Sequence, residues 1–236
     1  MEKNNLATGS KEARENRKNL IKEKPDHPFS NGLKQAFPLD AAKEILEKGD
    51  PLEFLINTVG KLHVGDKAVV AWHICSGLSS GLRDRKNTIH IQTVGNSGKG
   101  KSASQDHTGL IFENIETITS SSAKSQFYKA EAGILPNGGI IRFDESEGSE
   151  EALILERALT DKSLLVPTHD TVSINRQFKQ LKIKQINAVW KNSVSPPEDE
   201  QVNNRYIILN VDESPEQDIA VLKRQINLRT AFKENQ

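Results

Sequence analysis

Hydrophobic residues are sparse at the start of the chain and become periodic after residue 36. Residues 1–36 interleave lysine and arginine with acidic residues, which predicts a disordered charged tail. Over 37–84 the apolar positions recur at helical spacing, which predicts an N-terminal helical cap. Its expected helices cover 41–48, 51–60 and 66–82, and Leu39 and Asp40 would form the staple and N-cap of the first.

The third of these helices carries the two residues of this segment with the most chemical interest. His73 shares an apolar face with Ile74 and Leu78, so we expect a packed core residue rather than a ligand. Cys75 is the single cysteine of the chain and is expected to be a small buried hydrophobic residue. One cysteine excludes a disulfide within the chain.

Beyond residue 85, short runs rich in β-branched residues alternate with helical patterns. The expected strands cover 88–94, 116–119, 139–145, 183–194 and 206–211. The expected helices start near residue 100, cover 121–132 and 148–161, and run from about 215 to 233. This alternation predicts an α/β core over 85–215 with a central parallel five-stranded sheet, followed by one C-terminal helix in 216–236.

A hairpin-like pattern over 163–182 interrupts this alternation, and its expected turn is Pro167–Asp170. Its trailing side is basic through Arg176, Lys179, Lys182 and Lys184. The basic hairpin 163–184 is therefore a candidate contact for the phosphates of DNA.

A glycine-rich loop follows the first strand of the core and matches G-x-x-x-x-G-K-[ST] at every required position. The loop consists of Gly95, Asn96, Ser97, Gly98, Lys99, Gly100, Lys101 and Ser102. Glycines allow backbone N–H groups to surround a phosphate, and the following helix adds the positive end of its dipole. We predict a P-loop in which Lys101 reaches the β and γ phosphates of ATP and Ser102 is a ligand of Mg²⁺. A plain glycine turn between strand and helix is the alternative.

Two acidic residues end the strand 139–145, and the first of them, Asp144, lies 42 positions beyond Ser102. This is the form of a Walker B element, in which Asp144 holds Mg²⁺ through water and Glu145 accepts a proton from the attacking water. A solvated acidic turn is the alternative. Arg142 is unusual here, because a strand buried on both faces is normally continuously apolar.

Charge and hydropathy limit the partners and the cellular compartment that we expect for the protein. Thirty-two basic and thirty-two acidic residues cancel, so only a local basic patch could bind nucleic acid. No apolar run approaches the length of a membrane span, and the start of the chain has no signal-peptide core. We expect a cytoplasmic protein without a membrane partner.

The order of elements over 85–215 resembles the core of AAA+ ATPases, and GNSGKGKS and IIRFDE carry most of the resemblance. It implies a three-layer sandwich in which Lys101, Ser102, Asp144 and Glu145 act on nucleotide, magnesium and water. It also implies that Asn192, at the end of the fourth strand, is sensor 1. Arg205 would be an arginine finger that acts on a neighbouring subunit, which implies a homo-oligomer.

Finer features are similar to those of replicative helicases. The hairpin resembles the pre-sensor-1 hairpin of the minichromosome maintenance and superfamily III groups, which implies single-stranded DNA as partner. DESPEQ and the segment 121–128 are similar to primase-associated helicase domains of phages and plasmids, which implies a primase or another replication partner. The single C-terminal helix would be an incomplete lid, and the sensor 2 arginine stays open between Arg224 and Arg229.

Three functions are compatible with these features. The first is an ATP-driven helicase or translocase module that acts on DNA in replication. The second is a small-molecule kinase, although no arginine-rich lid segment follows the P-loop. The third is a binding protein that uses ATP as a switch with little hydrolysis.

Overall fold

The computed structural model describes residues 39–82, 84–118, 123–135, 137–143, 150–161, 166–172, 178–196 and 200–234. The chain divides into two units, 1–51 and 52–236. The described part of the first unit contains helix α3 (Leu39–Lys48), which confirms the first expected helix. Asp40 lies in the first turn of α3 and not before the helix, so its predicted N-cap position is wrong. The predicted tail 1–36 lies outside the described residues.

The second unit begins with two helices that the apolar spacing predicted. Helix α4 (Pro51–Gly60) matches its expected bounds, whereas α5 (Lys67–Ser79) ends three residues before the expected Leu82. Val59 of α4 packs against Val70 and Ile74 of α5. Leu78, which was expected on the buried face, is 57% exposed, whereas Gly77 and Ser79 beside it are buried, so the last turn of α5 buries a different face from the one expected.

His73 is fully buried, as expected for a core residue. Its Nδ1 lies 2.9 Å from the Val69 carbonyl oxygen, and its Nε2 lies 3.2 Å from Thr93 Oγ1 in the sheet. Burial lowers the pKa of His73 to about 4, so the ring is neutral at neutral pH. Cys75 was expected to be buried and is only half-buried.

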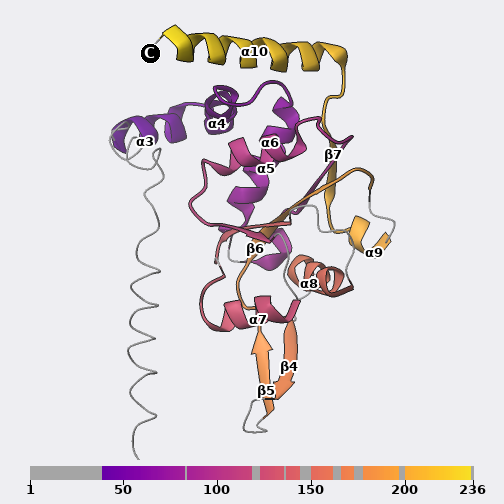
Figure 1. The fold of residues 1–236 in the computed structure, drawn as a ribbon. Helices are drawn as coiled ribbons and strands as arrows, with labels where there is room; N and C mark the ends of the chain where they lie inside the picture. The colour runs from indigo at the N-terminus through magenta and orange to yellow at the C-terminus, as the bar shows by residue number, and fades with distance from the viewer. Residues whose placement is uncertain are drawn as a thin grey trace, which may run out of the picture. The chain divides into compact units, whose positions relative to one another are not determined.

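The central sheet has five parallel strands in the order β2-β3-β6-β1-β7. Strands β6 and β7 are labelled in Figure 1. The strands are β1 (Ile91–Val94), β2 (Ile115–Ile118), β3 (Gly139–Phe143), β6 (Asn187–Ser193) and β7 (Ile207–Asn210). The predicted α/β fold is therefore confirmed. The first and fourth strands start later than predicted, because Thr88, His90 and Ile183 are buried without belonging to the sheet. An apolar pattern reports burial, and burial extends beyond the hydrogen-bonded ladder.

Helices cover both faces of the sheet, which gives three layers. On one face, α7 (Ala123–Glu131) and α8 (Glu150–Thr160) pack on Phe143 and Val189. On the other face lie α5 and α6 (Lys101–Gly109), next to Trp190. The remaining described helical elements are η1 (Arg85–Asn87), α9 (Glu200–Asn203), which was not expected, and α10 (Pro215–Glu234). No helix among the described residues is long and apolar enough to cross a membrane.

Arg142, the charged residue within β3, is explained by its partner. Its guanidinium pairs with the Asp106 carboxylate on α6, and its side chain keeps 15% exposure. The ion pair joins the sheet to the helix that follows the glycine loop. The strand can therefore carry a charge between buried neighbours without leaving that charge unpaired.

The predicted hairpin is present, but its predicted turn is wrong. Strands β4 (Thr168–Val172) and β5 (Phe178–Lys182) are antiparallel, and Thr168 through Asp170 pair with β5 instead of turning. The His169 ring lies 5.5 Å from that of Phe127 on α7, and Thr171 Oγ1 lies 3.1 Å from Tyr128 Oη. These contacts with α7 outweigh the local turn preference of the sequence.

Candidate phosphate-binding site

The glycine loop lies between β1 and α6, at the carboxyl edge of the sheet. Gly100 has a φ of 91°, in the region that favours glycine, and a Cβ there would meet nothing within 4 Å. At Gly95 a Cβ would lie 2.5 Å from Val211 Cγ2, so only glycine fits beside β7. Helix α6 begins at Lys101, which directs its N-terminal N–H groups and positive dipole end toward the loop.

The ammonium group of Lys101 lies inside this loop. Lys101 is 6% exposed, and its Nζ donates to the carbonyl oxygens of Gly95 at 2.6 Å and Asn96 at 2.8 Å. A buried cation, open glycine positions and a helix N-terminus together suit the phosphates of a nucleotide.

The strand order places Asn192 next to Ser102. Strand β6 lies between β1 and β3, and Asn192 is the register partner of Thr93 on β1. The Asn192 Nδ2 atom lies 3.3 Å from Ser102 Oγ, although the residues are 90 positions apart in sequence. Asn192 is 4% exposed, and its Oδ1 has no hydrogen-bond partner among the described residues. The structure thus brings the predicted sensor residue to the predicted magnesium ligand.

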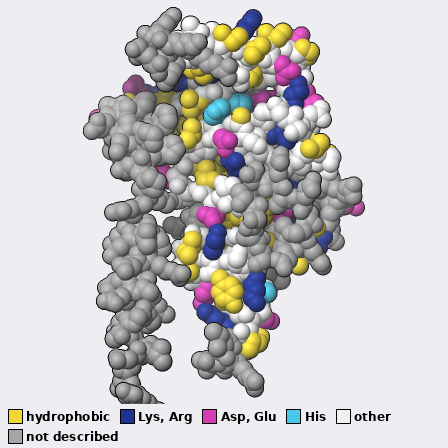
Figure 2. Space-filling view, in the orientation of Figure 1, with side chains coloured by type: hydrophobic (Ala, Val, Ile, Leu, Met, Phe, Trp, Pro, Cys, Tyr) yellow, Lys and Arg dark blue, Asp and Glu magenta, His cyan; other side chains and the backbone are white. Residues whose placement is uncertain are grey.

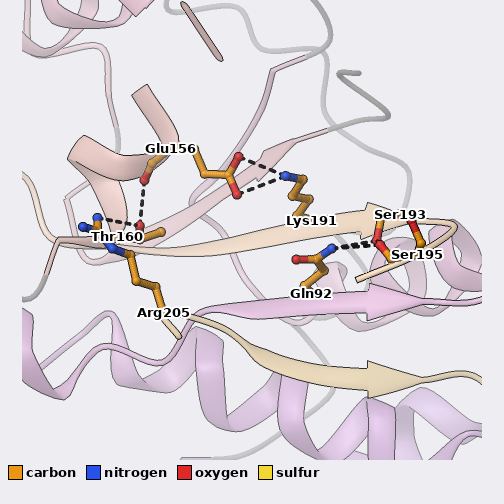
Figure 3. Close-up of polar contacts among 7 residues, drawn as sticks. All are labelled: Gln92, Glu156, Thr160, Lys191, Ser193, Ser195 and Arg205. Atoms are coloured by element: carbon orange, nitrogen blue, oxygen red, sulfur yellow. Dashed lines mark hydrogen bonds and ion pairs between the residues drawn. The ribbon is translucent and has the colours of Figure 1, made fainter. Parts of the chain in front are cut away.

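A buried glutamine that the sequence did not single out supports the same end of β6. Gln92 Nε2 donates to Ser193 Oγ at 2.7 Å, and Ser193 Oγ donates to the Ser195 carbonyl oxygen at 2.7 Å (Figure 3). These bonds fasten the residues that follow Asn192 to β1. The sequence signal that could have identified Gln92 was a polar residue inside an otherwise apolar strand.

The predicted acidic pair Asp144 and Glu145 lies outside the described residues. The described part of β3 ends at Phe143, whose register partner is Lys191 on β6. Strand β3 therefore ends at the edge of the sheet where Asn192 lies. Among the described residues, no group of three or more His, Cys, Asp or Glu side chains is arranged to hold a metal ion.

Arg205 lies away from the glycine loop of its own chain. It precedes Ile207, the register partner of Ile91, and so lies at the amino edge of the sheet, whereas the loop follows Val94 at the carboxyl edge. Its Nη1 donates to the Arg157 carbonyl oxygen at 2.7 Å. The same Nη1 lies 3.5 Å from Thr160 Oγ1 on α8 (Figure 3). The structure does not bring Arg205 together with Lys101 and Asn192.

Lys191, which directly precedes Asn192, forms a buried ion pair with Glu156 that was not expected from sequence. Lys191 Nζ lies 3.0 and 3.1 Å from the two carboxylate oxygens of Glu156 on α8 (Figure 3). The side chains are 17% and 4% exposed. Burial, followed by the negative charge of Glu156, raises the pKa of the nearby Tyr206 phenol well above its ordinary value. Neither Glu156 nor Lys191 belongs to a recognised motif, so the sequence offered no signal for this pair.

Two further carboxylates contact the glycine loop from the segment that follows β7. Glu213 Oε2 accepts a hydrogen bond from Asn96 Nδ2 at 2.7 Å, and its Oε1 accepts the Asn96 backbone N–H. Asp218 Oδ2 lies 2.7 Å from Lys99 Nζ. Two loop residues that were predicted to bind nucleotide thus bond to carboxylates in this structure.

A cavity of about 450 Å³ adjoins the loop. It is lined by Gly98, Lys99 and Gly100 of the loop, by residues of the α4–α5 connection, and by α6 and α10. In its wall, the Nδ1 atoms of His63 and His107 lie 3.3 Å apart. Burial, and then the neighbouring His63, lower the pKa of His107. Arg224 of α10 also lines the cavity, whereas the side chain of Arg229 lies outside the described ones.

The profile of one protein family, the MTBMA_p00010 P-loop domain, matches residues 36–233. A comparison with curated proteins finds no match.

Proposed function

We propose that this chain, which belongs to the MTBMA_p00010 P-loop domain family, is an AAA+-type ATPase that works as a motor module on DNA. Membership in a P-loop family supports nucleotide binding and, in general, nucleotide hydrolysis. The choice of ATP, the AAA+ assembly and the action on DNA are the steps that we add.

The observation that carries the proposal is the contact between Asn192 and Ser102. A serine at the end of a P-loop suits Mg²⁺, and an amide beside it with an unpaired Oδ1 suits a water or a phosphate oxygen. Ser102 and Asp144 would hold Mg²⁺, which supplies positive charge to the phosphates when bound. Asn192 would orient the attacking water, and Glu145 would accept its proton. Lys101 would move from the loop carbonyls to the phosphates.

The cavity beside the loop suits the rest of the nucleotide. Its volume of about 450 Å³ is in the range of small-molecule sites, and the loop residues Gly98, Lys99 and Gly100 form one wall. We therefore assign the base and ribose to this cavity, between α6 and α10. Arg224, which lines it, is our candidate for sensor 2.

The position of Arg205 favours action on a neighbouring copy. Arg205 lies at the opposite edge of the sheet from its own loop, and its contacts with α8 hold the guanidinium in place. An arginine that completes a neighbour's site raises turnover by about 10³ to 10⁵ in enzymes that use one. Hydrolysis would then require assembly.

The hairpin β4–β5 is the proposed DNA contact. Hydrophobic and basic side chains lie side by side over it (Figure 2), and Phe178 is 70% exposed. Lys182 and Lys184 are exposed, whereas Lys179 lies 3.0 Å from Glu131. Exposed lysines suit phosphates, and an exposed aromatic ring suits the face of an unpaired base. Single-stranded DNA is therefore the expected partner.

ATP hydrolysis measured with and without single-stranded DNA, across a range of protein concentrations, tests the proposal. A motor of this kind should turn over faster with DNA and more than proportionally faster as concentration rises, and Glu145→Gln should abolish turnover. Transfer of phosphate to an added small molecule would favour a kinase. Binding of ATP with turnover fixed at the Glu145→Gln level would refute the motor and favour a switch.

A further inference from the structure

The segment 212–218, which we call the strap, consists of residues that follow β7 and of the first turn of α10, and it bonds to the glycine loop. Its Glu213 receives two hydrogen bonds from Asn96, one from the backbone N–H and one from Nδ2. Its Asp218 pairs with Lys99 at 2.7 Å. Glu213 and Asn96 are 117 positions apart in sequence, so this contact is a product of the fold.

The strap is also bonded to the connection between α4 and α5. The Asp212 N–H donates to Asp66 Oδ1 at 2.8 Å, and Gln217 Nε2 donates to the Val64 carbonyl oxygen at 2.6 Å. Gly65, with a φ of 75°, leaves room for Gln217, because a Cβ there would lie 2.1 Å from Gln217 Oε1. The strap therefore contacts both the glycine loop and the connection between α4 and α5.

The strap carries negative charges, which repel the negative charges of a nucleotide. Hydrogen bonds from Ser214 lower the pKa of Asp212, so this carboxylate is ionised at neutral pH. Glu213 and Asp218 add two more acidic groups beside the loop. Lys99, one of the two cations of the loop, is already neutralised by Asp218. Phosphates that enter the loop would meet repulsion from the strap as well as attraction from Lys101.

We propose that Glu213 and Asp218 set the nucleotide affinity of the loop, because they compete with phosphate for it, and that nucleotide binding releases the strap. This inference rests on the proposed nucleotide binding. Helix α10 begins at Pro215, within the strap, so release would loosen the first turn of α10. Occupancy of the loop would in this way be transmitted to the C-terminal helix.

Titration of the full chain with MgADP, followed by calorimetry, tests the competition. Glu213→Gln keeps the size of the side chain and an oxygen that can accept the Asn96 N–H, but it removes the charge. We expect Glu213→Gln and Asp218→Asn each to bind MgADP about tenfold more tightly than the natural chain. Glu216→Gln is the matched control, because Glu216 is exposed, belongs to the same helix as Asp218 and lies between Glu213 and Asp218 in sequence. Its affinity should change less than about twofold.

Hydrogen exchange of the strap and α10 provides a second readout. Release predicts faster exchange over 212–216, which precede the α10 residues that line the cavity, when MgADP is bound. A lid that closes on the nucleotide predicts slower exchange there. Unchanged or weaker binding by Glu213→Gln, or slower exchange in the complex, would overturn the inference. If the natural chain binds no MgADP but the double variant of Glu213 and Asp218 does, the strap competes as we infer. If neither binds, the proposed function itself fails.

Discussion

The buried pair of Lys191 and Glu156 gives the sharpest prediction for stability. Lys191→Met keeps most of the aliphatic stem but leaves the Glu156 carboxylate buried without its cation. Removal of one partner of a buried ion pair costs about 3–5 kcal/mol. For a chain of this size, that corresponds to a fall in Tm of about 6–20 °C.

Two further variants separate charge from packing. The double variant Lys191→Met with Glu156→Leu removes both charges, and we expect it to recover most of the lost stability, because an apolar pair of similar volume replaces a buried ion pair at little cost. Lys179→Met is the matched control. It breaks a pair of the same 3.0 Å length, but its side chains are 50% and 46% exposed. That pair should contribute less than about 1 kcal/mol.

Urea denaturation followed by circular dichroism gives the free energy of unfolding for each variant. The reasoning is refuted if Lys191→Met and Lys179→Met cost the same, or if the double variant is no more stable than Lys191→Met alone. Either result would mean that burial does not determine the strength of this pair.

Two other predictions concern pH and DNA. The pKa of His73 is about 4 in the folded protein, below the ordinary 6.5. The contribution of the neutral ring to the free energy of unfolding is therefore fully present above pH 6.5 and is lost as pH falls toward 4. The loss should reach about 3 kcal/mol, and denaturation of His73→Gln as a function of pH should show a flatter profile in this window. Replacement of both Lys182 and Lys184 by alanine should weaken single-stranded DNA binding and reduce its salt slope by about 1.4, whereas Lys179→Ala should change the slope less, because Glu131 already pairs with it. Fluorescence anisotropy over a salt series measures the slope, and equal slopes for all variants would exclude the hairpin as the contact.

The sequence was sufficient to predict those features that a run of neighbouring residues encodes. The glycine loop could be recognised because eight consecutive residues encode it, and the strands could be recognised because burial of parallel strands requires apolar runs. The fold class followed from the alternation of these strands with helices. Asn192 was also selected, but through the resemblance of the order of elements to AAA+ ATPases, which implies that it is sensor 1.

The sequence was insufficient where a partner far along the chain decides the outcome. Thr168 through Asp170 have turn-like sequence, yet contacts of β4 with α7 make them a strand. Arg142 was unexplained until the fold supplied Asp106. The bond between Glu213 and Asn96 has no local pattern, because each residue alone is an ordinary surface residue. These contacts depend on three-dimensional proximity, which periodicity does not encode.

The measurement that tests the central claim most directly is ATP hydrolysis by Asn192→Ala, together with its affinity for MgADP. If Asn192 orients the attacking water, turnover should fall about 100-fold while the Kd for MgADP stays within about twofold. Asn137→Ala is the matched control, because Asn137 precedes β3 at the amino edge of the sheet and should leave both quantities unchanged. Normal turnover by Asn192→Ala, or loss of MgADP binding equal to the loss of turnover, would contradict the account.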